Sequence, residues 1–338
     1  MSITPLASSL KSETTVHVPI MVAPIVQCLT EALPALLLQS GEQKLWLVDC
    51  TLGGGGHTSA ILAALHQKTE LQGRVGILGI DQDERALERA KVRFSSEIES
   101  GEIELFHGRF SEIEDLVRSR PCVGLLADFG FSSDQIENPE RGLSFRADGP
   151  LDMRLDPTRG QSARTWLLKA RESEIEQVLR EFGEERFSKR IAAAIVDRRR
   201  KEGMPETAKG FADFISGLMP AATRYGRIHP ATRVFQAIRI QVNDELGEIE
   251  RLLKEVLPQL RPGARVALMS FHSLEDRLVK IALKDREGLF VPLTKKPIEA
   301  DDLEVSRNPR SRSAKLRLAE RRSDEAGKSR DGEIDPDV

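Results

Sequence analysis

The chain has 338 residues, of which 40% are hydrophobic, and its formal net charge at pH 7 is −3. This length and apolar content suffice for one large domain and a smaller one. The small net charge excludes a polycation, so any contact with nucleic acid must come from local basic patches. Cys28, Cys50 and Cys122 follow no C-x-x-C spacing, which argues against a disulfide framework or a zinc site and favours the reducing cytoplasm. No metal is expected.

The first residues lack the charged segment and long apolar core of a secretory signal. The most apolar segment, residues 21–38, is interrupted by Gln27, Thr30, Glu31 and two prolines. This composition predicts an amphipathic helix packed on the domain, not a membrane span. We therefore expect a cytoplasmic protein with no membrane association.

A glycine-rich loop follows the first predicted strand. Residues 45–48 are apolar and favour a strand, residues 53–56 are all glycine, and residues 58–65 have apolar side chains at helical spacing. A loop uses glycine this densely when a ligand must approach its backbone, although glycines needed only for a tight turn are the alternative. His57 ends the loop and could simply bind backbone groups there.

A second predicted strand, residues 75–80, ends at Asp81. An α/β nucleotide-binding fold places there the carboxylate that holds ribose hydroxyls. The loop lacks the G-x-G-x-x-G spacing of dinucleotide-binding proteins, and Asp81 lies too far along the chain for that motif. The pattern therefore favours a nucleoside ligand without phosphates, such as S-adenosylmethionine.

Further strands are predicted at residues 103–106, 122–127, 265–270 and 316–319, and helices at 111–118 and 231–257. Repeated strand and helix units with near-continuous apolar strands predict an α/β fold with a mostly parallel sheet covered on both faces. Between the fourth strand and the long helix, only helices are predicted, near 163–182, 184–201 and 208–218. Such a block is typical of an inserted domain, which would stand over the cofactor crevice as one wall of the active site.

Several motifs then occur in an unbroken order. They are Gly-Gly-Gly-Gly-His at 53–57, Gly-Ile-Asp at 79–81, Ala-Asp-Phe-Gly-Phe-Ser-Ser-Asp-Gln at 127–135, the segment 140–156, Phe-Gly-Glu-Glu-Arg-Phe at 182–187, the segment 229–239, Ser-Phe-His-Ser-Leu-Glu-Asp-Arg at 270–277 and Asn-Pro-Arg-Ser-Arg-Ser at 308–313. In these motifs the chain resembles the bacterial 16S ribosomal RNA (cytosine-N4)-methyltransferases of the MraW type, over residues 17–322.

The resemblance implies a Rossmann-like class I methyltransferase fold with an inserted all-helical domain. Its expected parts are residues 1–137 and 230–322 for the methyltransferase domain, 138–229 for the helical insertion and 323–338 for a disordered acidic tail. It also implies S-adenosylmethionine as methyl donor, and the N4 of a cytosine at the decoding region of the small ribosomal subunit as acceptor. The cofactor contacts that it implies are Gly55, Gly56, His57, Asp81, Phe110, Asp128 and Gln135.

The chain departs from the family pattern at two places. Pro24 stands where the family's N-terminal motif has a glutamate, which leaves that glutamate without a role here. Asp134 replaces the proline of Ser-Ser-Pro-Gln, but Asp128 and Gln135 stay in register.

Asp128 is the candidate catalytic residue, because it follows the fourth strand at the expected crevice mouth. The lone pair of the cytosine amine is delocalised into the ring and a proton must leave during transfer, so a carboxylate that holds the amine or accepts the proton would assist. His272, after the strand 265–270, is a weaker candidate, since it could equally cap the next helix beside Ser273 and Glu275.

Basic residues gather in segments 186–201 and 307–322. Both segments would suit binding to the phosphates of RNA, although a basic helix face is often only solvated. Two other functions compete with methylation of ribosomal RNA. One is methylation of a DNA or protein amine, against which the absence of an Asp/Asn-Pro-Pro-Tyr/Phe motif argues. The other is a binding module that keeps the cofactor without catalysis, against which the presence of Asp81, Asp128 and Gln135 argues.

Overall fold

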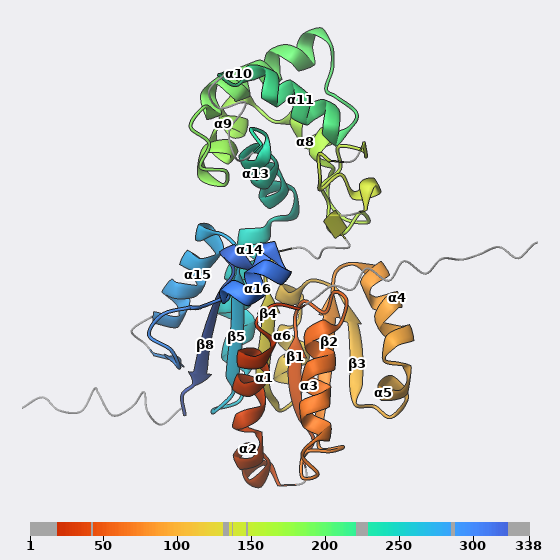
Figure 1. The fold of residues 1–338 in the computed structure, drawn as a ribbon, viewed down its shortest axis with the longest axis vertical. Helices are drawn as coiled ribbons and strands as arrows, with labels where there is room; N and C mark the ends of the chain where they lie inside the picture. The colour runs from red at the N-terminus through yellow and green to blue at the C-terminus, as the bar shows by residue number, and fades with distance from the viewer. Residues whose placement is uncertain are drawn as a thin grey trace, which may run out of the picture.

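The computed structural model describes residues 19–41, 43–130, 135–136, 138–146, 148–220, 229–284 and 288–323. These residues form two units (Figure 1). The sheet unit contains the β-sheet and the helices on its two faces. The helical unit, described between residues 138 and 243, stands over one edge of the sheet. The predicted fold class is confirmed: a Rossmann-like, mostly parallel α/β sheet carries an inserted helical part.

The sheet has eight strands in the order β3-β2-β1-β4-β5-β8-β6, with β7 paired to β8. Strands β1 to β5 run parallel, whereas β8 runs antiparallel to β5, β6 and β7. Their bounds are β1 Leu45–Asp49, β2 Val75–Asp81, β3 Ile103–His107, β4 Cys122–Asp128, β5 Arg265–Ser270, β6 Phe290–Pro292, β7 Ile298–Glu299 and β8 Lys315–Arg321. Each strand predicted from an apolar run is therefore present.

The central strands are apolar along their length because helices cover both faces of the sheet. Every residue of β1 is buried, and β4 is buried up to Asp128 at its end. Parallel pairing sets Asp49 beside Gly79 of β2 and Leu126 of β4. The carboxyl ends of β1, β2 and β4 therefore meet at one edge, which is the edge beneath the helical unit (Figure 1).

The helices of the sheet unit are α1 Val22–Glu31, α2 Leu33–Ser40, α3 Gly56–His66, α4 Glu84–Arg93, α5 Ser95–Glu99, η1 Phe110–Glu112, α6 Glu114–Arg118, α14 Glu245–Arg251, η3 Leu252–Val256, η4 Leu257–Gln259, α15 Ser273–Lys284, α16 Asp302–Arg307 and η5 Pro309–Ser313. The segment Val22–Ser40 is the one described stretch that is long and apolar enough to cross a membrane. It is broken after α1, where Pro34 opens α2, and α1 buries Ile25, Cys28 and Leu29 in the sheet core. This packing agrees with the predicted amphipathic helix packed on the domain, although the structure divides that helix into two.

The helical unit has a hydrophobic core of its own, which includes Trp166, Leu179, Ile191 and Phe211. Its elements are η2 Pro139–Arg141, α8 Ala163–Lys169, α9 Glu172–Glu181, α10 Ser188–Lys201, α11 Ala208–Leu218 and α13 Thr232–Asn243. The helix predicted from residue 184 begins four residues later, because Glu184 has a left-handed φ of 48°.

The prediction of one long helix at residues 231–257 is wrong. Asp244 has a φ of 53°, which ends α13 and lets α14 start in a new direction. Apolar residues of α13 such as Phe235 pack in the core of the helical unit, whereas Ile249 of α14 packs in the sheet core. The helical core thus includes residues that follow the predicted boundary at 229. Periodicity could not reveal the break, because both helices are amphipathic.

Two glycines allow a test of the tight turn that leads into the helical unit. Gly142 has a φ of 61°, and a Cβ there would collide with the backbone carbonyl of Pro150. Gly160 has a similar φ of 66° but open space around it. We expect Gly160→Ala to cost roughly 1 kcal/mol through left-handed strain alone. Gly142→Ala should cost about 1–3 kcal/mol more because its neighbours must move. Urea unfolding measures both, and equal losses would contradict this packing.

Candidate functional site

A cavity of about 420 Å3 lies between the carboxyl edge of the sheet and the helical unit. The glycine loop, the ends of β2 and β4 and the start of α15 line one side, and residues from both ends of the helical unit line the other. Of the predicted site residues, those in its lining are Gly56, His57, Asp81, Phe110, Asp128, Gln135 and His272. Gly55 is absent from the lining among the described residues. The structure thus gathers at one place residues that lie far apart in the sequence.

The glycine loop brings Gly53 and Gly54, rather than Gly55, to the cavity. Gly55 has a φ of 70° and serves as the N-cap of α3. A Cβ at Gly55 would lie 2.5 Å from the Phe94 ring, and one at Gly56 would lie 2.9 Å from Pro19. Two of the glycines are therefore required by the packing of the loop, in addition to its access to a ligand.

Asp81 is held at the end of β2 by two backbone donors. The N–H groups of Gly53 and Asp83 each donate to one of its carboxylate oxygens over 2.8 Å. Burial raises the pKa of Asp81 to about 6, and the two N–H bonds oppose that rise. Each oxygen keeps a second lone pair, so the carboxylate can also accept from the hydroxyls of a ribose.

Asp49, at the end of β1, was not predicted as a site residue. Its carboxylate accepts from the Thr58 hydroxyl over 2.7 Å and from the Thr51 N–H over 3.2 Å. Burial raises its pKa, while these bonds favour the charged form. Asp49 thus ties the glycine loop to α3 from behind. Its place at the end of a strand, like that of Asp81, is the signal that would have indicated it.

Asp128, at the end of β4, differs from these two carboxylates in one respect. Its Oδ1 atom is buried and has no hydrogen-bond partner among the described residues. Burial raises the pKa of Asp128 to about 7, with smaller contributions from His57, which lowers it, and from Asp49 and Glu275, which raise it. The residue therefore presents an unpaired carboxyl oxygen with a near-neutral pKa beside the cavity, as a proton acceptor requires.

Three further predicted residues have partners within the protein. The Nε2 atom of His57 lies 2.8 Å from the carbonyl oxygen of Ile20, so the ring joins α3 to the segment before α1. Gln135 donates to Asp83 over 3.3 Å. Phe110 packs its ring 5.9 Å from the ring of Phe129, which leaves it at the cavity wall, where it can flank a planar group.

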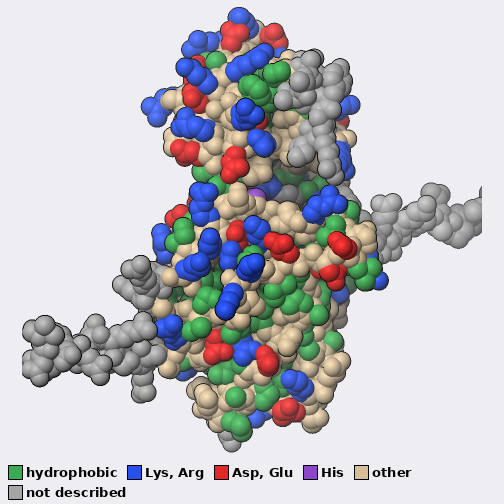
Figure 2. All heavy atoms as spheres, turned by 60° about the vertical axis from the view of Figure 1, so that its left-hand side comes forward, with side chains coloured by type: hydrophobic (Ala, Val, Ile, Leu, Met, Phe, Trp, Pro, Cys, Tyr) green, Lys and Arg blue, Asp and Glu red, His purple; other side chains and the backbone are tan. Residues whose placement is uncertain are grey.

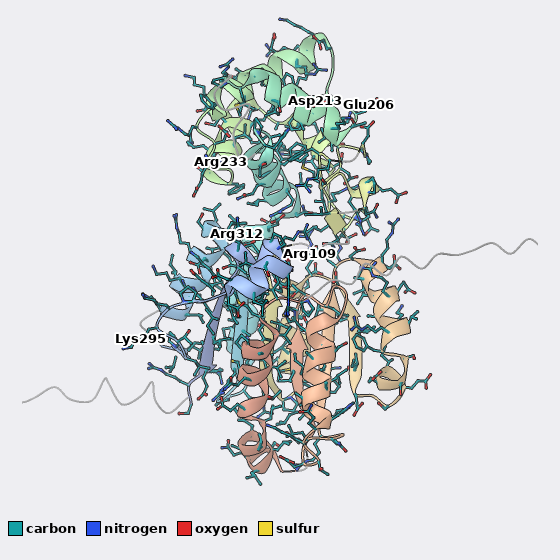
Figure 3. The ribbon with its side chains drawn as sticks, in the orientation of Figure 1. Arg109, Glu206, Asp213, Arg233, Lys295 and Arg312 are labelled. Carbon is teal, nitrogen blue, oxygen red and sulfur yellow. The ribbon has the colours of Figure 1, made fainter. Side chains whose placement is uncertain are left out.

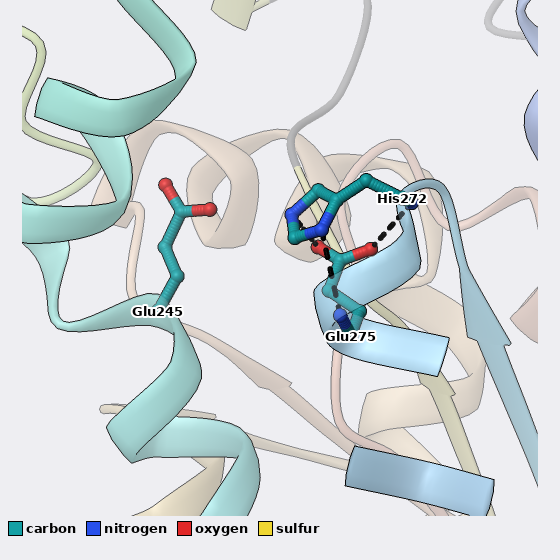
Figure 4. Close-up of side chains that lie close together, drawn as sticks. All are labelled: Glu245, His272 and Glu275. Carbon is teal, nitrogen blue, oxygen red and sulfur yellow. Dashed lines mark hydrogen bonds and ion pairs between the residues drawn. The ribbon is translucent and has the colours of Figure 1, made fainter. Parts of the chain in front are cut away.

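His272 and Glu275 form a reciprocal cap at the start of α15 (Figure 4). The Glu275 carboxylate accepts from the N–H of Phe271 over 2.7 Å and of His272 over 3.2 Å, and the Glu275 N–H donates to His272 Nδ1 over 3.4 Å. Burial alone would raise the pKa of Glu275, but the hydrogen bond and charge of His272 lower it. The structure thus supports the capping interpretation of His272, while leaving its ring in the cavity lining.

Glu245 lies close to this pair, and the three residues could meet at a metal ion by position. Both carboxylate oxygens of Glu245 already accept from Arg239, over 2.7 and 2.8 Å. Glu275 is engaged by His272 and two backbone N–H groups. Because the carboxylates are paired and a guanidinium adjoins them, this group does not fit a cation.

Two polar side chains that sequence reasoning missed shape the junction of the units. Arg141 of η2 forms an ion pair across it with Asp83 over 2.5 Å. Within the helical unit, Asn243 of α13 bonds to the backbone of Met153 and Leu155. Asp83 could have been recognised in the sequence as the N-cap residue before α4. Arg141 carries no such signal, since its partner lies 58 positions away in the sequence.

The two basic segments differ in their partners. On α10, Arg199 donates to the carbonyl oxygens of Leu167 and Ala170, while Arg198 and Lys201 pair with acids on the same helix end. In the second segment Arg310 lines the cavity and Arg312 lies close to the junction of the units (Figure 3). Figure 2 shows Lys and Arg side chains gathered on the sheet unit below this junction. The second segment is therefore better placed to meet a polyanion at the site.

Comparison with known proteins gives matches over most of the chain. A model of the MraW methylase family matches residues 14–322. The Ribosomal RNA small subunit methyltransferase H of Synechococcus sp. (strain JA-2-3B'a(2-13)) is 43% identical over 305 residues, which cover 87% of this chain and 91% of that protein. Among solved structures, an rRNA methylase from Streptococcus thermophilus has a TM-score of 0.35 at 12% identity, covering 86% of this chain and 93% of its own. A putative methyltransferase from Streptococcus mutans, in complex with SAH, has a TM-score of 0.33 at 12% identity, with coverages of 86% and 97%.

The hydrogen bonds of Asp81 generate a test of the cofactor site. In Asp81→Asn, an amide NH2 group replaces one of the two carboxylate oxygens. That group cannot accept a hydrogen bond from the backbone N–H that it faces, and the charge is lost. Since hydrogen bonds to a charged group contribute ~1.5–3 kcal/mol, we expect the affinity for S-adenosylhomocysteine to fall by roughly 10–100-fold, as measured by calorimetry. Asp115→Asn, at a side chain that is 94% exposed, should bind normally. Unchanged affinity in Asp81→Asn would exclude the ribose role.

Proposed function

Because the chain belongs to the MraW methylase family, we propose that it methylates the exocyclic N4 of a cytosine in 16S ribosomal RNA, at the decoding region of the small ribosomal subunit. Family membership confirms S-adenosylmethionine as the cofactor. The 43% identical relative, named for the ribosomal RNA of the small subunit, supports that RNA as acceptor. The choice of the cytosine N4 rests on the sequence motifs. We propose that the protein acts in the cytoplasm.

The unpaired carboxylate oxygen of Asp128 is the observation that supports this chemistry. The bound sulfonium supplies the methyl group for an in-line displacement. The amine must be held along that line and must lose a proton, and the unpaired Oδ1 of Asp128 suits both tasks. Its pKa of about 7 is close to that of an efficient general base at physiological pH. His272 stays a weaker candidate, because the cap of α15 already engages it.

The remaining site residues would hold the cofactor. Asp81 would accept from the ribose hydroxyls, Phe110 would flank the adenine, and the loop from Gly53 to His57 would surround the methionine part. Gln135 would also contact the cofactor, since it lines the cavity beside its bond to Asp83. Gly55 would act indirectly, by capping α3 outside the lining.

The acceptor base would enter from the side of the helical unit. Phe145, Met153, Leu155 and Phe235 give the cavity an apolar wall there, against which a base turned out of its stack can pack. The base would have to be flipped out of its stack, because the methyl donor would lie inside the cavity. A protein or DNA amine stays the competing acceptor, and nucleoside analysis separates it from ribosomal RNA.

The central experiment is transfer of labelled methyl to purified small subunits that lack the modification, followed by mass spectrometry of the nucleosides. We expect N4-methylcytidine with the wild-type protein and a fall of about 10²–10⁴-fold in Asp128→Asn, the usual contribution of a general base. Asp213→Asn, at an exposed acid of the helical unit (Figure 3), is the matched control. Full turnover by Asp128→Asn at saturating cofactor would refute the catalytic role.

The pH dependence has a definite sign. Asp128 accepts a proton only when charged, and burial raises its pKa to about 7. The kcat/KM of the wild-type enzyme, which reports the free protein, should therefore increase as the pH rises through about 7 and then level off. The same limb should be missing from the residual activity of Asp128→Asn, and its persistence would assign the titration to another group.

A further test concerns the second basic segment. If exposed Arg312 contacts phosphate, Arg312→Gln should weaken binding to the small subunit and reduce the slope of log affinity against log salt by roughly 1. Lys91→Gln provides the control, since Lys91 is exposed on α4 towards the opposite edge of the sheet. An equal slope for Arg312→Gln and the wild type would remove Arg312 from the RNA-binding surface.

A further inference from the structure

A buried ion pair joins the helical unit to the cofactor side of the sheet unit. Arg141, in η2, lies 2.5 Å from Asp83, which caps α4, and the two side chains are only 7% and 5% exposed. Burying two charges is costly unless their geometry and further hydrogen bonds compensate for the lost water. Here Asp83 also accepts from the Arg85 N–H and from Gln135, and Arg141 donates to the carbonyl of Leu155.

This pair lies in a continuous polar chain between the two halves of the cavity. At one end, the Asp83 N–H donates to Asp81 Oδ1 over 2.8 Å. At the other, Arg141 donates to the Leu155 carbonyl over 2.9 Å, and the Leu155 N–H donates to Asn243 over 2.8 Å. Asp81 lines the cofactor side of the cavity, while Leu155 and Asn243 line the wall from the helical unit.

We infer that Arg141 is a positioning residue that couples the cofactor to the acceptor, through its pair with Asp83. The inference rests on the proposed function, because it takes RNA as the ligand of the helical unit's wall. Asp83 is fixed by the same guanidinium that fixes Leu155. An arrangement of the units that suits the cofactor's ribose therefore also sets the wall against which the base packs. Parting the units would separate the two charges, so that each loses the counter-ion that compensates for its burial.

A second ion pair between the same two elements provides a built-in control. Arg85 of α4 lies 3.2 Å from Glu140 of η2, but their side chains are 60% and 74% exposed. An exposed pair contributes little because water screens it. Glu140→Gln therefore removes a charge next to Arg141, across the same junction, without touching the buried chain.

The experiment uses full-length Arg141→Met, Asp83→Asn, the double variant and Glu140→Gln. Asparagine still caps a helix, so Asp83→Asn breaks the ion pair with little change at α4. Calorimetry gives the affinity for S-adenosylhomocysteine alone. Affinity for unmodified small subunits is then measured with and without S-adenosylhomocysteine, and the ratio of the two is the coupling. Steady-state methylation supplies kcat and both KM values, and thermal unfolding shows which variants fold.

In the wild type we expect S-adenosylhomocysteine to tighten subunit binding by about 5–150-fold, the usual range of coupling. Arg141→Met and Asp83→Asn should each bring this ratio close to 1 and lower kcat on the order of 10²-fold, since the reacting groups lose alignment. The double variant should lose less than the two single losses combined, because the residues act as one unit. Glu140→Gln should match the wild type.

The inference is overturned if Arg141→Met and Asp83→Asn keep the wild-type coupling and kcat, or if they differ from the wild type only in melting temperature. It is also overturned if Glu140→Gln loses as much as Arg141→Met. Failure of the proposed function has a different signature, since the wild type would then leave the subunits unmethylated. Even in that case the cofactor arm tests the Asp83 end of the chain, because it needs no acceptor.

Discussion

The structure depends on the withdrawal of carboxylates from water at one edge of a parallel sheet. Strands that run in parallel end together, so the acids that close β1, β2 and β4 share a region of low dielectric. The carboxylates of Asp49 and Asp81 accept hydrogen bonds from the Thr58 hydroxyl and from backbone N–H groups, which stabilise their charged forms. Asp128 alone of the three has a buried oxygen that no described residue satisfies. Asp128 is thus the strand-end acid among these three with an oxygen still able to accept a hydrogen bond.

The same constraint explains how the helical unit is attached. Its connection to the sheet unit includes two ion pairs: Arg141 of η2 pairs with Asp83, and Arg239 of α13 pairs with Glu245 of α14. Within the helical unit, Asn243 holds the segment around Leu155. The helical unit has its own hydrophobic core, separate from the two clusters that cover the faces of the sheet. Directional hydrogen bonds and a buried ion pair specify one orientation more sharply than apolar contact would. One wall of the cavity is thereby set at a defined place above the carboxyl edge of the sheet.

Sequence patterns predicted the strands, and two of the three strand-end acids as site residues, because buried parallel strands are continuous apolar runs whose ends are marked by the first polar residue. Asp81 and Asp128 were identified in this way and line one cavity. The patterns were less informative about direction. They could not show that Asp244 turns the chain between α13 and α14, nor that Gly53 and Gly54 replace Gly55 at the cavity, since both depend on backbone angles that several residue types can adopt.

The sequence by itself determined the α/β class, the glycine loop, the inserted helices and the family, because these features are local in the chain or lie in an ordered set of motifs. Only the tertiary structure decided which groups are satisfied and which remain unpaired. Arg141 and Asp83 are 58 positions apart, and His272 is a capping residue because Glu275 and the backbone of α15 surround it. Burial and hydrogen-bond partners belong to the packed molecule, and they govern the charge, orientation and availability of each side chain at the site.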